Sequence, residues 1–148
     1  TALLVRWLHA ADDVADMVLM FQKEVVDRLV ARPGSKDYGR LSVLAQDVCE
    51  VRRLFDVPPS AFVPPPKVVS SVARLTPRPR TERLAELGPL ERVTAAAFGQ
   101  RRKMLRASLA RIFTDPTATL TKLGLPPTAR AEELSAADFV RLAGTLDT

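Results

Sequence analysis

The chain contains few of the residues from which metal centres, disulfides and phosphate-binding loops are built. It has one cysteine, Cys49, and one histidine, His9. A single residue of each type argues against a disulfide framework, a zinc site and a Cys–His nucleophile pair, and the lone thiol fits a reducing, cytoplasmic setting. The six glycines stand apart from one another, so no Gly-x-Gly loop is present.

Long apolar runs are absent too. None of the apolar stretches is long enough to cross a bilayer, and the chain does not open with a signal-peptide pattern, so we expect no membrane partner. The composition is that of one globular unit. Of the 148 residues, 47% are hydrophobic, and a chain of this length buries about 70% of its unfolded surface.

Positive charge is concentrated in one segment. Residues 74–111 contain ten basic and three acidic side chains, whereas the rest of the chain contains twelve basic and fourteen acidic ones. A basic segment on an otherwise nearly neutral protein favours a polyanionic partner. The alternative is a solvated helix face rich in arginine.

The hydrophobic pattern divides the chain near residue 78. In residues 1–78, helical spacing alternates with short apolar runs, which predicts an α/β unit. Helices are expected at residues 2–8, 23–30 and 39–46, and strands at residues 17–21, 48–57 and 68–75. The run Met17–Phe21 is continuously apolar, as in a strand that is covered on both faces.

Residues 79–148 show no strand pattern and predict a small all-α unit. Helices are expected near residues 90–98, 100–112, 116–123 and 136–146. Ser135 and Asp138 form a helix-start pattern before the last of them. A proline-containing hinge at residues 78–80 is expected to join the two units.

A proline-rich loop holds the most informative single side chain. Residues 58–67 read Pro-Pro-Ser-Ala-Phe-Val-Pro-Pro-Pro-Lys. Residues 64–66 favour a stiff extended segment with no backbone donors. Phe62, beside this segment, offers a flat face on which a planar ligand can stack. The alternative is that its ring packs into the core beneath the loop.

A second unusual feature is a basic cluster, Gln100-Arg101-Arg102-Lys103 followed by Arg106, at the expected start of a helix. Cations at a helix N-terminus oppose the helix dipole and destabilise the helix by about 0.3–1 kcal/mol each. A phosphate bound there makes the cations favourable, because both they and the helix N-terminal amides attract it. The cluster therefore favours an anion site over a solvated face. Gly39 and Arg40, at a loop–helix junction, form a second candidate for phosphate.

Four motifs resemble those of the ribosomal RNA adenine dimethyltransferases, which place two methyl groups on the exocyclic nitrogen of adjacent adenines. They follow the family's order and spacing, and the resemblance extends over essentially the whole chain. The motifs are Gln22-Lys-Glu-Val-Val-Asp-Arg28, Ser35-Lys-Asp-Tyr-Gly-Arg-Leu-Ser42, Pro59-Ser-Ala-Phe-Val-Pro-Pro-Pro-Lys-Val68 and Ala97-Phe-Gly-Gln-Arg-Arg-Lys103.

The resemblance implies a fold and an activity. Residues 1–78 would hold the C-terminal strands of a Rossmann-like class I methyltransferase sheet, and residues 79–148 a helical RNA-binding domain. The implied reaction is N6,N6-dimethylation of adenine in 16S ribosomal RNA of the small subunit, with S-adenosylmethionine as methyl donor. The family's glycine-rich cofactor loop and its Asn-Leu-Pro-Tyr catalytic motif do not occur here. We therefore expect a fragment that is inactive alone and holds no cofactor-binding residue.

The family's motifs also imply residue roles. Phe62 matches the aromatic residue that stacks on the flipped-out target adenine, where the pocket must replace the stacking lost on flipping. Other matching positions would contact RNA at the rim of the active site and at the start of the helical domain. They are Lys23, Arg28, Arg40, Lys67, Gln100, Arg101, Arg102, Lys103 and Arg106.

The sequence leaves two other functions open. One is a non-catalytic RNA- or ribosome-binding module, and the other is a paralogue of the same fold that acts in mitochondrial transcription.

A sheet without its first strands would leave the strand at residues 17–21 with an unpaired side. Unpaired edges of apolar strands recruit other chains, so we also expect a dimer or aggregate through this edge.

Overall fold

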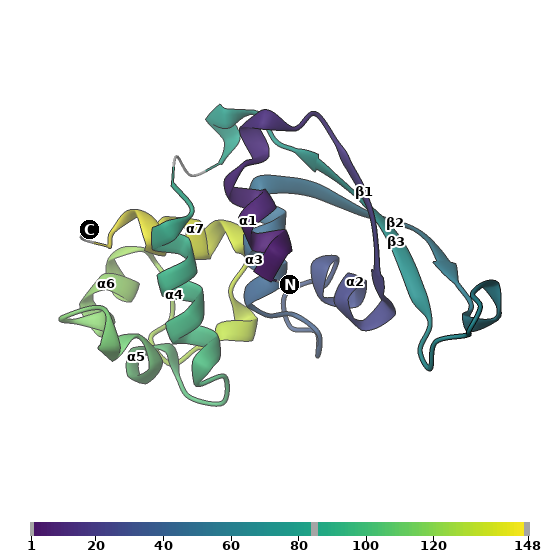
Figure 1. The fold of residues 1–148 in the computed structure, drawn as a ribbon. Helices are drawn as coiled ribbons and strands as arrows, with labels where there is room; N and C mark the ends of the chain where they lie inside the picture. The colour runs from purple at the N-terminus through teal and green to yellow at the C-terminus, as the bar shows by residue number, and fades with distance from the viewer. Residues whose placement is uncertain (1, 84–85, 147–148) are drawn as a thin grey trace.

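The first part of the chain forms a three-stranded antiparallel sheet. Its strands are β1 (Met17–Gln22), β2 (Cys49–Val57) and β3 (Ser70–Pro77). The order β1-β3-β2 makes β3 the central strand and leaves β1 and β2 at the edges (Figure 1). The three predicted strands are confirmed, and their ends differ from expectation by at most two residues. The computed structural model describes residues 2–83 and 86–146.

Helices lie against one face of this sheet. They are α2 (Lys23–Leu29) and α3 (Arg40–Val48), while α1 (Ala2–His9) packs against α3, and all three helices are close to the predicted ranges. α2 contacts β1 and β3, and α3 contacts β2. Along β3, Ser71, Ala73 and Leu75 are buried, because alternate residues of a strand point to the same face.

The other face of the sheet is exposed and partly apolar. Val18 and Met20 of β1 are 58% and 52% exposed, and they lie opposite Arg74 and Val72 of β3. The expectation that residues 17–21 are covered on both faces is wrong for the described residues, because the helices pack on the opposite face. Among the described residues, β1 pairs with β3 alone, so its other edge has no strand partner there.

The second part contains helices and 3₁₀ turns, and no strand among its described residues. Its helices are α4 (Gly88–Gly99), α5 (Leu105–Ser108), α6 (Pro116–Lys122) and α7 (Ala136–Gly144). The predicted start of the last helix is confirmed, since Ser135 Oγ accepts from the Asp138 N–H at 3.1 Å and the Asp138 carboxylate accepts from the Ser135 N–H at 3.2 Å. The helix expected over residues 100–112 is shorter: α5 begins at Leu105 and is followed by a 3₁₀ turn at Leu109–Arg111.

α3 joins the two parts of the chain. It packs against β2 and also against α4 and α7, so buried apolar side chains form one cluster across both parts. The loop before α3 is anchored by Tyr38, which is fully buried and donates its hydroxyl to the Leu134 carbonyl at 2.8 Å. Burial raises the pKa of this hydroxyl, so it stays a donor. This packing brings the ends of α2 and α4 close to the start of α3.

Candidate nucleic-acid interface

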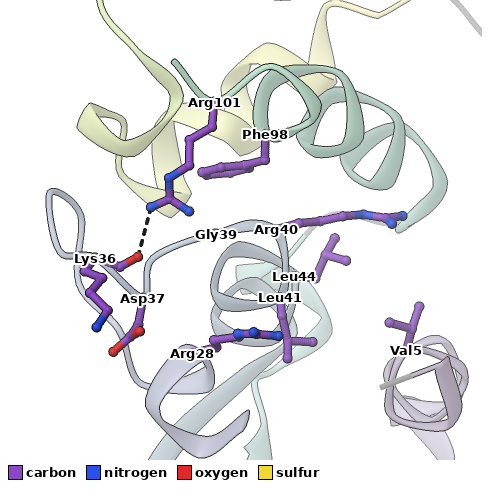
Figure 2. A pocket seen from close by; sticks show the side chains of 10 residues that line it. All are labelled: Val5, Arg28, Lys36, Asp37, Gly39, Arg40, Leu41, Leu44, Phe98 and Arg101. Atoms are coloured by element: carbon purple, nitrogen blue, oxygen red, sulfur yellow. Dashed lines mark hydrogen bonds between the residues drawn. The ribbon is translucent and has the colours of Figure 1, made fainter. Parts of the chain in front are cut away.

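A basic cavity of about 430 Å³ lies where α1, α2, α3 and the end of α4 meet (Figure 2). It collects three of the predicted RNA-binding residues, Arg28, Arg40 and Arg101, from three separate segments. It also includes Lys36, which the sequence did not single out as a binding residue. The residues that line the cavity are Val5, Arg28, Lys36, Asp37, Gly39, Arg40, Leu41, Leu44, Phe98 and Arg101.

Side chains of α3 fix the end of α2, which carries Arg28. The Ser42 hydroxyl donates to the Arg28 carbonyl at 2.5 Å and accepts from the Gly39 N–H at 3.1 Å. The Gln46 amide donates to the carbonyls of Leu29 and Ala31 at 2.9 and 2.8 Å. These bonds satisfy carbonyls that the end of a helix leaves without partners, and they hold Arg28 beside the start of α3.

Arg101 connects the second part of the chain to the loop before α3. Its guanidinium donates to the Lys36 carbonyl at 3.2 Å and lies 3.7 Å from the Glu132 carboxylate. Its Cζ also lies 5.9 Å from the centre of the Phe98 ring, within the range of a cation–π contact. Figure 2 shows this side chain between Phe98 and the loop.

The expectation that the basic cluster opens a helix is wrong. α4 ends at Gly99 and α5 begins at Leu105, so residues 100–103 form the turn between them. Lys103 N–H donates to the Gln100 carbonyl at 2.9 Å within this turn. Because the turn follows the C-terminal end of α4, its cations lie at the end of that helix where the dipole favours positive charge.

The cluster still presents unpaired positive charge at the surface. Arg102, Lys103 and Arg106 are exposed and make no ion pair within residues 2–83 and 86–146. Gln100, Arg102 and Lys103 line a second cavity, of about 410 Å³, that shares Phe98 and Arg101 with the basic cavity. A continuous cationic surface therefore runs from the cavity over the turn.

Arg40 and Arg28 differ in their surroundings. The Arg40 guanidinium lies 3.9 Å from Glu91, whose other carboxylate oxygen is 2.5 Å from His9 Nε2. Arg28 is exposed and has no acidic partner in the described part of the chain. An anion in the cavity would meet Arg28 without displacing a protein carboxylate.

Lys23 lies outside the cavity, at the start of α2. Its ammonium is 3.1 Å from Asp27, which also binds Arg53. Burial acts to raise the pKa of Asp27, but hydrogen bonds from Lys23 and Arg53 outweigh it and hold the pKa below its usual value. Asp27 therefore stays ionised and partly neutralises Lys23.

Phe62 and Lys67 also lie outside the cavity, in the β2–β3 loop. This loop extends from one end of the sheet, away from the second part (Figure 1). Phe62 is half-buried and is not among the apolar side chains that pack against the buried cluster, while Lys67 is exposed. The neighbouring Val63 is 98% exposed. Stacking by Phe62 stays a prediction.

Metal and thiol chemistry find no support in the described residues. They contain no group of three His, Cys, Asp or Glu side chains that could hold a metal ion. Cys49 is fully buried, and burial raises the pKa of its thiol to about 11, which keeps it protonated at neutral pH. No helix in the described part of the chain has both the length and the apolar character that a membrane span requires.

Curated relatives match along almost the whole chain. It is 60% identical over 147 residues to ribosomal RNA small subunit methyltransferase A of Rhodospirillum rubrum, which covers 99% of this chain and 51% of that protein. The protein of the same name from Paramagnetospirillum magneticum is 56% identical over 147 residues, with 99% and 52% coverage. The chain thus spans about half the length of the curated relatives it matches.

Solved structures agree with this likeness. A dimethyladenosine transferase from Plasmodium falciparum superposes with a TM-score of 0.77 at 24% identity, over 96% of this chain and 61% of that one. The 23S rRNA methyltransferase ErmE gives a TM-score of 0.63 at 26% identity, over 99% and 61%. A family model described as ribosomal RNA adenine dimethylase matches residues 1–148. The chain belongs to the ribosomal RNA adenine dimethylase family.

Proposed function

We propose that this chain takes part in S-adenosylmethionine-dependent N6,N6-dimethylation of adenine in small-subunit ribosomal RNA, and that it supplies a surface that binds the RNA. The observation that carries this proposal is the basic cavity, where Arg28, Arg40 and Arg101 converge from separate segments. The names of the relatives support the substrate, because both are called ribosomal RNA small subunit methyltransferase A. The partner is then the small ribosomal subunit, in the cytoplasm.

The proposed fold assignment is more specific than an α/β unit. We assign β1, β2 and β3 to the C-terminal strands of a Rossmann-like class I methyltransferase sheet in residues 1–78, and residues 79–148 to a helical RNA-binding domain. The superposition on the dimethyladenosine transferase supports this assignment.

Within this surface the side chains have separate tasks. Phe62 stacks on the target adenine after it leaves the RNA helix, which offsets the stacking energy lost on flipping. Lys23, Arg28, Arg40 and Lys67 bind RNA phosphates, Arg28 and Arg40 at the basic cavity and Lys67 in the same loop as Phe62. The remaining contacts come from the turn after α4 and from α5, through Gln100, Arg101, Arg102, Lys103 and Arg106.

The described residues do not fit S-adenosylmethionine. The six glycines, at positions 34, 39, 88, 99, 124 and 144, stand apart from one another in the sequence, so they form no glycine-rich phosphate loop of the kind that dinucleotide-type sites use. β1 ends at Gln22 without an acid, and the acid at the end of β2, Asp56, forms an ion pair with Arg53 at 3.4 Å. We therefore assign no cofactor contact to this chain, and the methyl donor is proposed from the relatives alone.

A chimeric enzyme tests the proposed reaction. This chain replaces its 60%-identical counterpart in the Rhodospirillum rubrum relative, and transfer of labelled methyl groups to small-subunit particles is measured. We expect N6,N6-dimethyladenosine at the same nucleotides that the unaltered relative methylates. A folded chimera that binds RNA and transfers no methyl group would contradict the enzymatic role.

A further inference from the structure

The basic cavity is larger than contacts with RNA phosphate require. Phosphate contacts need only a cation at the surface, whereas this cavity encloses about 430 Å³. That volume lies within the range of about 300–1,000 Å³ for sites that hold small molecules. The cavity therefore has room for more than a phosphate group.

Cations stand on two sides of this space. Figure 2 places Arg28 on one side of the α3 side chains and Arg40 on the other. Arg28 makes no ion pair in the described part of the chain, and the contact of Arg40 with Glu91, at 3.9 Å, is long. Asp37 is the single acidic residue that lines the cavity, so the net charge of the lining is positive.

Apolar side chains form the rest of the wall. They come from α1, α3 and α4, as Val5, Leu41, Leu44 and Phe98. The Phe98 ring is half-buried and is held in place by the rings of Tyr38 and Phe139, at centroid distances of 6.0 and 5.3 Å. A ring fixed in this way presents a preorganised apolar surface.

We propose that the cavity binds one unstacked nucleotide of RNA, with its base against Val5, Leu41 and Phe98 and its phosphate on Arg28, which has no acidic partner in the described part of the chain. Cationic side chains beside an apolar or aromatic surface are the combination with which proteins bind single-stranded RNA. The site is separate from the one proposed for the target adenine, because Phe62 does not line this cavity. The inference rests on the proposed function, since it adds a second nucleotide to the same RNA substrate.

Three small probes test the site on the whole chain: AMP, adenosine and inorganic phosphate, each followed through amide NMR shifts. We expect AMP to bind about tenfold or more tightly than inorganic phosphate, since the base adds its own contact. The amides of Gly39, Leu41 and Phe98 should shift most. Arg28→Gln should weaken AMP binding about fivefold or more. Arg32→Gln is the matched control, because Arg32 is exposed nearby and does not line the cavity.

The outcomes separate this site from the proposed function. If AMP binds no more tightly than phosphate, or shifts amides away from the cavity, the nucleotide site is wrong. If Arg28→Gln behaves like Arg32→Gln, the phosphate is misplaced and the site is again wrong; Arg40→Gln gives the same comparison if the first variant does not fold. Binding of a small-subunit ribosomal RNA fragment is measured in parallel. If the unaltered chain does not bind this RNA fragment, the proposed function itself is contradicted.

Discussion

Arg101 links two segments that are far apart in the sequence. Its contacts with the Lys36 carbonyl and Glu132 fix the loop before α3 to the second part of the chain. We expect Arg101→Gln to lower the free energy of unfolding by about 1 kcal/mol, because one hydrogen bond and one half-exposed ion pair are lost. Urea denaturation measures this change. Arg102→Gln, which removes an exposed cation without an ion pair, should change stability by less than about 0.5 kcal/mol, and equal effects of the two variants would contradict the structural role of Arg101.

Phe62 is predicted to act on the reaction rather than on RNA docking. In the chimeric enzyme, Phe62→Ala should slow methyl transfer about tenfold or more, because a stacking contact contributes about 1–3 kcal/mol. The salt dependence of RNA binding should not change, since the ring carries no charge. Val63→Ala alters the 98% exposed neighbour and serves as the control. Equal activity of the two variants would remove Phe62 from the site.

Cys49 is predicted to be unreactive in the folded chain. Burial raises its thiol pKa from 9.0 to about 11, so almost no thiolate is present at neutral pH. Alkylation by iodoacetamide should be much slower than in urea-unfolded protein. Because the folded pKa is the higher one, the stability linked to this group is complete below pH 9 and is lost as the pH rises toward 11. Alkylation at the unfolded rate would show that the thiol is not buried.

At the scale of elements, most helices and strands could be predicted from local sequence patterns. The strand ranges, α1 to α3 and the Ser135 start of α7 follow from alternation, helical spacing and capping chemistry. α5 was harder, because the apolar spacing of Leu105 and Leu109 is the same in an α-helix and in the short helix plus 3₁₀ turn that occurs. Among the described residues, helices pack on only one face of β1. The apolar run of β1 could not predict this, because it depends on which helices pack against the sheet.

The exposed side of the sheet predicts self-association. Val18, Met20, Leu54 and Phe55 are exposed apolar side chains on the two edge strands, and β1 has a free edge among the described residues. We expect sedimentation to detect a dimer or larger species that grows with concentration. Met20→Lys should shift the distribution toward monomer, whereas Val63→Lys, in the loop outside the sheet, should not. A monomer at all concentrations would contradict the prediction.

At the scale of the whole molecule, the candidate site is a product of the tertiary fold. The sequence indicated Arg28, Arg40 and Arg101 as separate basic positions, through family motifs and charge. It did not indicate that they line one cavity with Lys36 and Phe98, because that arrangement depends on the packing of α3 against α4 and on the burial of Tyr38. The basic turn at residues 100–103 was predicted as a phosphate site because it was expected to open a helix. That reason is wrong, since α5 begins only at Leu105.

The most direct test of an RNA-binding surface on this chain is the salt dependence of its binding to a small-subunit ribosomal RNA fragment. We predict that log K falls linearly with log salt concentration, by about 0.7 for each phosphate contact with single-stranded RNA. Replacing Arg102 and Lys103 together by Gln should flatten that slope by about 1.4 and leave stability nearly unchanged, because both are exposed and make no ion pair in the described part of the chain. A slope that is the same in the double variant, or binding that does not depend on salt, would contradict the proposed RNA surface.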